Sequence, residues 1–292
     1  MTAIAIQSTG KNGWATVLWA LALVAVAAAL ARVVVATDLM VPTFGVLILF
    51  GLIHGTLRYG VVNLLVFIAI CLVVSNIYEN ASILTGFPFG NYHYTDSPKL
   101  FNVPLNVGPF YFAMGYTSWQ VASVLLDGAD AQLQRRINLF ALPLVAAVLM
   151  TVIDLSIDGS TSTIGHFWIW HDGGGFYGVP YTNYLGWTLT TWTFYQLFAF
   201  YLARRPDAVR PAPARSFFAL PVLGYASLGL HVVAMFTTAA SGSVVDQAGV
   251  SWQIAHIHEA AFLCATYTVV FLSVLALVKI ARGDLREIRI AG

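Results

Sequence analysis

The sequence predicts an all-α, polytopic transmembrane bundle of about eight spans, with seven as the alternative. Three observations lead to this class: the composition, the length of the apolar segments and the placement of the basic residues. Of the 292 residues, 59% are hydrophobic and only 9% are charged, whereas soluble domains are nearer ~45–50% apolar and ~25% charged. A soluble core of this size could not hide so many apolar side chains. We therefore expect a single integral-membrane domain over residues 1–292, crossing the cell (cytoplasmic) membrane several times.

Eight apolar segments are long enough to cross a bilayer, which takes about 20 residues in a helix. The second is short and contains Gly45 and Gly51, so its bounds are the least sharply defined. The segments run over residues 13–35, 41–57, 60–79, 105–126, 137–157, 183–203, 216–239 and 253–281.

The basic residues predict which side of the membrane each connection faces. With the N-terminus in the cytoplasm, every Lys and Arg except Arg32 and Lys99 falls on the cytoplasmic side, which is the bias that orients membrane proteins. An even number of spans then returns the C-terminus to the cytoplasm as well. The net charge is +1 and no basic block is present, so we expect no nucleic-acid partner.

Two carboxyl residues in apolar segments are the strongest indication of a site. Asp154 lies late in the fifth segment, and Glu79 ends the third. A charge within a span costs ~2.5–3.5 kcal/mol on insertion scales, and such groups usually face the bundle interior and serve a function. The alternative is that both are solvated at the interface or paired with a Tyr or His. Asp96, Asp158 and Asp172 fall in loops, where a solvated or turn-forming role is favoured, although Asp96 stays among the candidate catalytic residues.

Two stretches rich in aromatic residues, Gly and Pro lie between spans, at residues 86–116 and 168–187. Gly and Pro prevent a continuous helix there, and the predicted orientation puts both loops on the outer face. The alternative is a plain interfacial belt of aromatic residues, but tight turns with interleaved rings suit the wall of a pocket for a flat apolar ligand. The candidate substrate-binding residues are Phe87, Phe89, Tyr92, Tyr94, Trp168, Trp170, Tyr177, Asn183 and Trp187.

A weaker candidate site, for a metal ion, consists of His231, His256, His258 and Glu259. On a helix His256 and Glu259 share a face while His258 points elsewhere, and no HxxxH or HExxH spacing is present. Histidines that hydrogen-bond between helices are the favoured interpretation. If these residues did bind a metal, the chain would be a metal-dependent membrane lipid hydrolase.

Four features follow one another along the chain: GFPFGNYHYT from Gly86, then NVPLNVGPFYF, then Asp154, then GFYGVPYTNYLGW ending at Trp187. Together they resemble the membrane carotenoid hydratase family, which includes γ-carotene-type 1′-hydratases and bisanhydrobacterioruberin hydratases. The similarity runs over about residues 75–190, and loosely across all the spans. It implies a carotenoid biosynthesis enzyme that needs no cofactor and adds water to the terminal double bond of an acyclic carotenoid.

The residues are consistent with the chemistry that this resemblance implies. Hydrating an isolated alkene means protonating it to a tertiary carbocation and trapping the cation with water, and the acid must be neutral when substrate arrives. Aromatic faces stabilise a nearby cation. We expect Asp154 or Glu79 to supply the proton and the other carboxyl, or His93, to orient the water, and the residues leave open which does which.

The expected partners are the acyclic carotenoid, water and membrane lipid, with other membrane enzymes of carotenoid synthesis as further candidates. A non-catalytic carotenoid- or lipid-binding membrane protein with the same pocket is the remaining alternative.

Overall fold

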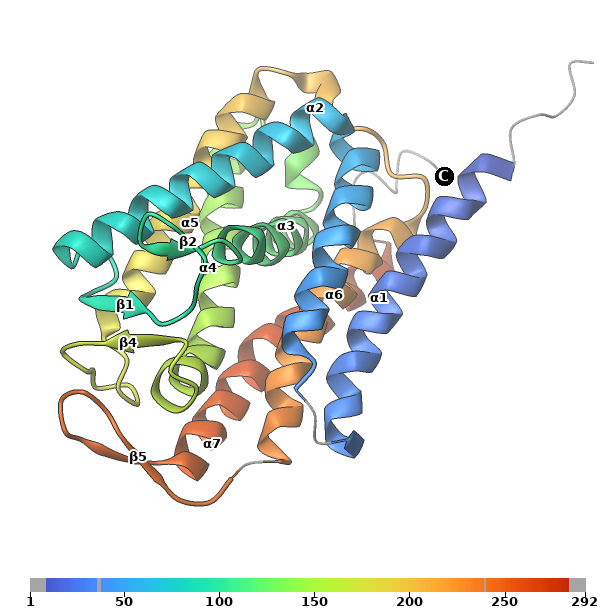
Figure 1. Ribbon diagram of the computed structural model, residues 1–292. Coiled ribbons are helices and arrows are strands. Elements are labelled where there is room, and N and C mark those ends of the chain that lie inside the picture. The colour runs from blue at the N-terminus through green and yellow to red at the C-terminus, as the bar shows by residue number, and fades with distance from the viewer. Residues whose placement is uncertain (1–8, 36–37, 239, 284–292) are drawn as a thin grey trace, which may run out of the picture.

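The computed structural model describes residues 9–35, 38–238 and 240–283. The chain forms a bundle of helices with short strands in the connections (Figure 1). The helices are α1 (Thr9–Val35), α2 (Met40–Thr85), α3 (Val107–Leu125), α4 (Arg136–Asp158), α5 (Tyr181–Ala203), α6 (Arg215–Phe236), α7 (Ile254–Ala265) and α8 (Phe271–Arg282). Two π-helical turns, η2 (Gly159–Ile164) and η4 (Thr266–Val270), extend α4 and join α7 to α8, and η1 (Ala129–Gln132) and η3 (Pro206–Ala208) are 3₁₀ turns. The strands are β1 (Tyr92–Tyr94), β2 (Lys99–Leu100), β3 (Val103–Pro104), β4 (Trp168–Trp170), β5 (Ser243–Val245) and β6 (Ser251–Gln253).

The helices coincide with the predicted apolar segments. Within the described residues, five of them are long and apolar enough to cross a membrane. The prediction of a mostly helical membrane bundle is therefore confirmed. The number of eight spans and the cytoplasmic location of the termini stay predictions, and both chain ends lie outside the described residues. The five helices cover residues 13–35, 40–85, 136–164, 215–236 and 254–282.

Gly60 divides α2 into two halves that run in different directions (Figure 1). Its φ of 76° and ψ of 161° lie in a region that is open to glycine and strained for other residues. A Cβ at this position would also come within 3.0 Å of the Arg210 guanidinium. The break frees the Arg58 carbonyl, which accepts the Arg210 N–H at 2.8 Å. The predicted segments 41–57 and 60–79 are thus two halves of one interrupted helix.

A buried ion pair fixes this break to the neighbouring elements. Arg58 Nε and Nη2 donate to the two carboxylate oxygens of Asp130 at 3.0 Å and 2.9 Å. The same carboxylate accepts the hydroxyls of Tyr59 at 2.7 Å and Ser123 at 2.6 Å. Hydrogen bonds to both oxygens offset much of the cost of burying the charges. The network therefore ties α2 to η1 and α3.

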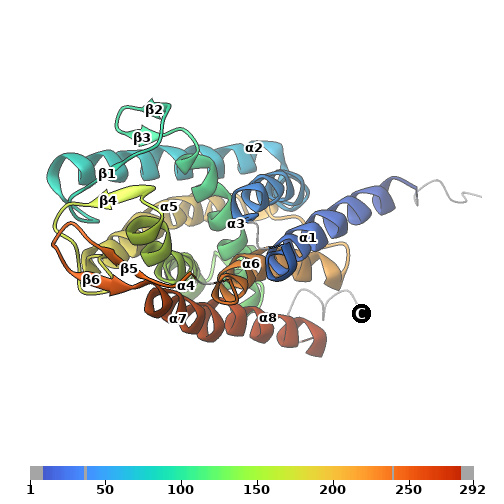
Figure 2. The same ribbon diagram turned by 60° about the horizontal axis from the view of Figure 1, so that its bottom comes forward.

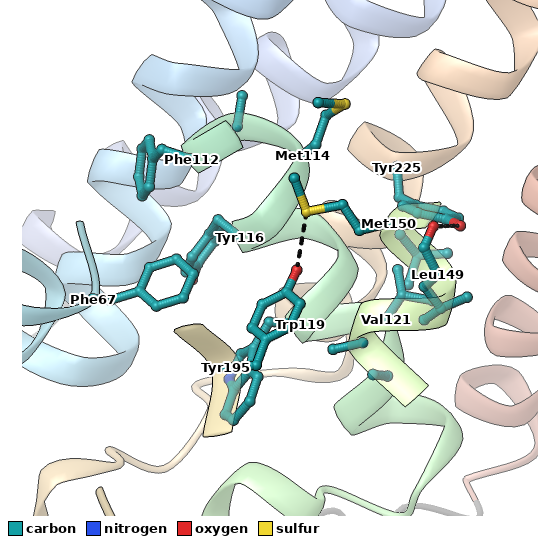
Figure 3. Packing of buried hydrophobic residues seen from close by; sticks show 14 of the residues in the cluster. Phe67, Phe112, Met114, Tyr116, Trp119, Val121, Leu149, Met150, Tyr195 and Tyr225 are labelled. Carbon is teal, nitrogen blue, oxygen red and sulfur yellow. Dashed lines mark hydrogen bonds between the residues drawn. The ribbon is translucent and has the colours of Figure 1, made fainter. Parts of the chain in front are cut away.

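Helix α3 runs through the centre of the bundle (Figure 1), and its side chains from residue 111 to 124 are buried on every face. A helix with no solvated face packs through shape and through satisfied polar groups. Figure 3 shows this packing, in which the Tyr195 hydroxyl points at the Met150 sulfur, 3.6 Å away. The Tyr225 hydroxyl donates to the Leu149 carbonyl at 2.8 Å in the same view (Figure 3). These bonds satisfy hydroxyls that lipid and water cannot reach.

The two aromatic loops lie together at one end of the bundle. Strands β1 and β4 pair antiparallel, so that Tyr92 lies opposite Trp170. Tyr94 lies opposite Trp168 in the same ladder. Figure 2 shows these strands beside the β5–β6 hairpin, on the side of the molecule away from α1. The two loops, far apart in the sequence, are thus paired side by side at one end of the bundle, and their role in a site stays a prediction.

Candidate active site

A partly open cavity of about 180 Å³ lies between α2, α3, α4, α5 and the β1–β4 ladder. Val41 and Phe167 mark its rim, since they are 60% and 49% exposed. Its deep part holds Glu79, Asp154 and Asn183, which are no more than 3% exposed. An apolar cavity with a few convergent polar groups is the usual form of a small-molecule site. The other lining residues are Asp38, Met40, Phe44, Phe89, Tyr92, Tyr94, Val107, Phe110, Tyr111, Met114, Ile157, Thr161, Trp168, Trp170 and Trp187.

Glu79, near the end of α2, is surrounded by tyrosine hydroxyls. Tyr111 of α3 donates to Oε1 at 2.7 Å. Tyr94 donates to Oε2 at 3.0 Å, and Tyr92 makes a short hydrogen bond to the same oxygen. Three donors occupy three of the roughly four lone-pair positions that the two carboxylate oxygens offer. The arrangement holds Glu79 in one orientation and joins α2, α3 and the first aromatic loop.

Asp154 and Asp158 form a pair of carboxyl groups, one turn apart on α4. The Asn183 side-chain nitrogen of α5 donates to Asp154 at 2.8 Å and to Asp158 at 2.6 Å. The Trp168 indole N–H donates to the other oxygen of Asp158 at 3.1 Å. Residues four apart on a helix point to the same side, so both aspartates face α5. A single amide in the deep part of the cavity therefore bridges Asp154, which lines the cavity, and Asp158, which lies behind it.

Aromatic rings form the walls around these groups. The Tyr111 and Trp187 rings stack with centroids 4.7 Å apart and an interplanar angle of 6°. The Tyr92 and Trp170 rings, on paired strands, are 4.9 Å apart. Phe89 packs edge-on against Trp187 at 6.4 Å. Seven of the nine predicted substrate-binding residues line the cavity, namely Phe89, Tyr92, Tyr94, Trp168, Trp170, Asn183 and Trp187.

Four predicted site residues lie outside the cavity. Side chains alternate along a strand, so Tyr92 and Tyr94 face inward and His93 between them is exposed. Asp96 is exposed in the following loop. Phe87 is 61% exposed, and Tyr177 packs against Trp252 of the β5–β6 hairpin instead. The cavity lining does not support a direct catalytic or binding role for these residues.

His93 makes a contact of a different kind, on the outer surface. Its Nδ1 lies 2.7 Å from Nε2 of His171, across the two aromatic loops. Desolvation, the neighbouring His171 and Lys99 lower the pKa of His93 below its ordinary value of 6.5. The pair connects the two loops that carry the cavity walls.

The structure also adds residues that the sequence did not indicate. Asp158, expected in a loop with a solvated or turn-forming role, is fully buried at the end of α4 because the helix continues further than predicted. Its spacing of four from Asp154 is the signal that could have placed it. Tyr111, Phe110 and Met114 line the cavity from α3, and nothing in a uniformly apolar segment shows which face of the helix meets a ligand.

The candidate metal ligands do not converge. His231 Nε2 pairs with the Thr43 hydroxyl at 2.7 Å, and His256 and Glu259 are exposed on α7. In the described part of the chain, no three His, Cys, Asp or Glu side chains are grouped as metal ligands would be. The bond from His231 on α6 to Thr43 on α2 agrees with the favoured interpretation of interhelical histidines.

The fold and the cavity define a class: a helical membrane protein whose bundle encloses a deep, aromatic cavity with carboxyl groups at its base. Within that class, residues 37–252 match the family described as carotenoid biosynthesis protein, and the chain belongs to this family.

One relative is similar to this chain over part of its length. Bisanhydrobacterioruberin hydratase from Haloarcula japonica is 32% identical over 115 residues. The match covers 38% of this chain and 36% of that protein, so it spans well under half of either. No solved structure matches the chain. The resemblance to carotenoid hydratases that the loop motifs indicate is confirmed.

Proposed function

We propose that the protein adds water to the terminal double bond of an acyclic carotenoid, as a multi-pass enzyme of the cell membrane. The observation that carries this proposal is the presence of Glu79 and Asp154, from two different helices, in one apolar aromatic cavity. The family and the named relative support a carotenoid as substrate. A whole polyene is much larger than the cavity. The end of the chain would therefore enter, and the remainder would extend past the rim into the lipid.

Asp154 is the proposed proton donor. Two ionised carboxylates one helical turn apart repel each other, and Asp154 and Asp158 share a single amide donor, Asn183. One proton held on this pair removes the repulsion and keeps an acid next to the substrate. Glu79, in contrast, has three hydroxyl donors, which stabilise a carboxylate. The two carboxyl sites thus suit different protonation states.

The proposed reaction needs only the alkene, one water molecule and the Asp154 proton, which is returned at the end. The Asp154 O–H bond breaks as its proton joins the less substituted alkene carbon, and the π electrons form the new C–H bond. The tertiary carbocation that remains is attacked by a water oxygen, which forms the C–O bond. The extra proton on that oxygen passes to the Asp154 carboxylate and restores the acid. No electron leaves or enters the substrate, so the proposal requires no cofactor.

The surroundings of the cavity suit the cationic intermediate. The faces of Tyr111 and Trp187 form a stacked aromatic wall, and aromatic faces attract cations, more strongly when water is excluded. The Glu79 carboxylate, fixed by the tyrosines, contributes a negative charge to the same cavity and orients the attacking water. General acid catalysis of this type contributes ~10²–10⁴-fold to rate.

Expression in cells that accumulate an acyclic carotenoid tests the proposal. Pigments are extracted from cells that make lycopene and from cells that make a bacterioruberin precursor. They are separated, and their molecular masses are measured by mass spectrometry. We expect at least one background to yield a product heavier by one water per reacted end. Unchanged pigment in both backgrounds would refute the proposal, and unchanged pigment that co-purifies with the protein would indicate carotenoid binding without catalysis.

A further inference from the structure

A second, smaller cavity lies behind the wall of the first. It is a half-open cavity with a volume of about 20 Å³, bounded by η2, β4, the end of β5 and the β5–β6 turn. Polar residues form much of its lining, among them Ser162, Thr163, Asp246 and Gln247. A space of about 10–15 Å³ with polar partners is enough to hold one water molecule. Its size and chemistry therefore suit water and exclude a carotenoid.

Trp170 separates the two cavities, since it lines both. It is 6% exposed, and its indole N–H makes no well-placed hydrogen bond to the described residues, although the Asp158 carboxyl lies near it. A buried donor that no protein group satisfies with good geometry calls for an explanation, and a water molecule is the usual one. The poorly satisfied N–H and the polar cavity that Trp170 lines point to the same ligand.

One lining residue of the small cavity also contacts the backbone of Asp158. Ser162 lines it and donates its hydroxyl to the backbone carbonyl of Asp158 at 2.8 Å. The neighbouring strand residue Trp168 donates to the Asp158 carboxyl. Ser162 therefore lies between water in the small cavity and Asp158, and Trp170 lies between that water and the large cavity.

We propose that the small cavity is a water site, and that it supplies the water molecule consumed in the large cavity past Trp170. The proposal rests on the hydration function proposed above. A polyene that enters through the apolar rim fills the opening through which bulk water would otherwise arrive. Water must then reach the carbocation from another side, and Trp170 is the shared wall between the polar cavity and the apolar one.

Plugging the small cavity tests this proposal. Val245 lines the cavity and is 58% exposed, so Val245→Phe enlarges a side chain at its outer edge without touching the carboxyl groups. Gln247→Trp is a second plug at the same edge. Val250→Phe is the matched control, because Val250 is on the same hairpin, is 45% exposed and lines neither cavity. Hydroxyl-radical labelling of Trp170 while carotenoid fills the large cavity, read by peptide mass spectrometry, reports water that reaches the wall from the small cavity. Single-turnover hydration of bound carotenoid reports the use of that water.

We expect wild-type Trp170 to be labelled despite its burial, and both plugs to reduce the labelling. The plugs should slow hydration about tenfold while carotenoid binding is unchanged, and Val250→Phe should leave labelling and rate as in the wild type. Absence of labelling in the wild type would overturn the water site. Labelling that persists in both plugs, or a full hydration rate with Trp170 protected, would overturn its role as the supply route. The labelling needs no turnover, so failure of the water site is distinguishable from failure of the hydratase function.

Discussion

The carboxyl groups of Asp154 and Asp158 lie one turn apart on α4 and share one donor, the side-chain nitrogen of Asn183, at 2.8 Å and 2.6 Å. All three groups are buried. A buried carboxyl that loses its donor costs about 1–3 kcal/mol or more. The hydrogen bonds from Asn183 therefore stabilise the bundle and also hold Asp154, the acid of the proposed reaction.

Replacement of Asn183 should reveal the shared bond. We expect Asn183→Ala to lower the free energy of unfolding by about 1–3 kcal/mol, because both aspartates lose the bond from Asn183 at once and Asp158 keeps only the bond from Trp168. Asp158→Asn should restore part of this stability in the double variant, since it removes one of the two carboxyl groups. A double-mutant cycle from thermal unfolding in detergent measures the coupling. Strict additivity of the two changes would argue against a shared bond.

Tyr111→Phe separates the hydroxyl from the ring. The variant keeps the stack on Trp187 but loses the donor to Glu79 at 2.7 Å. We expect carotenoid binding to persist and hydration to slow by about tenfold or more, as when one fixed donor is removed from a catalytic site.

Tyr225→Phe is the matched control for this change. It removes a buried hydrogen bond of 2.8 Å from the Tyr225 hydroxyl to the Leu149 carbonyl, and neither residue lines the cavity. We expect it to cost about 1 kcal/mol of stability and to leave the hydration rate unchanged. Equal loss of rate in Tyr111→Phe and Tyr225→Phe would mean that the first effect is only structural.

The contact between His93 and His171 predicts a pH dependence of stability. The pKa of His93 is lowered from 6.5 in the folded protein, so below about 6.5 the unfolded chain binds a proton more readily than the folded one. Stability is then complete above pH 6.5 and falls as the pH decreases toward the folded pKa. The effect should be modest, because the side chain is exposed. His93→Asn should flatten the fall in melting temperature between about pH 7 and pH 5 and keep full hydration activity. An unchanged slope would contradict this assignment.

We expect the ion pair between Arg58 and Asp130, at the break in α2, to contribute strongly to the stability of the bundle. Asp130→Ala leaves the Arg58 guanidinium buried without its carboxylate, a change that costs about 3–5 kcal/mol. Replacing both residues with leucine should cost less than the sum of the single changes. Exposed Asp207→Ala is the control and should leave the melting temperature unaltered. A small effect of Asp130→Ala would show that water reaches this network.

The sequence predicts the helices well because each span is a continuous apolar run, and the Gly and Pro residues in the loops mark where helices stop. It also indicates most of the aromatic wall, since those rings crowd two short loops. It does not indicate Tyr111, because α3 is buried on every face and its apolar residues do not distinguish the face that lines the cavity. The exclusion of His93 depends on the two-residue period of β1, a strand formed only by pairing with β4. Asp158 is predicted to lie in a loop because the apolar run ends before it, whereas the helix continues to include it.

The most direct test of the central claim is the hydration rate of Asp154→Asn at saturating carotenoid. Asparagine keeps the size of the side chain and can still hydrogen-bond to Asn183, but it cannot deliver a proton. We predict a folded protein that binds carotenoid and hydrates it ~10²–10⁴-fold more slowly. Asp172→Asn, an exposed change in the second loop, should behave as the wild type. Near wild-type turnover in Asp154→Asn would contradict the account and transfer the role to Glu79, and the same turnover in Glu79→Gln as well would exclude the acid mechanism.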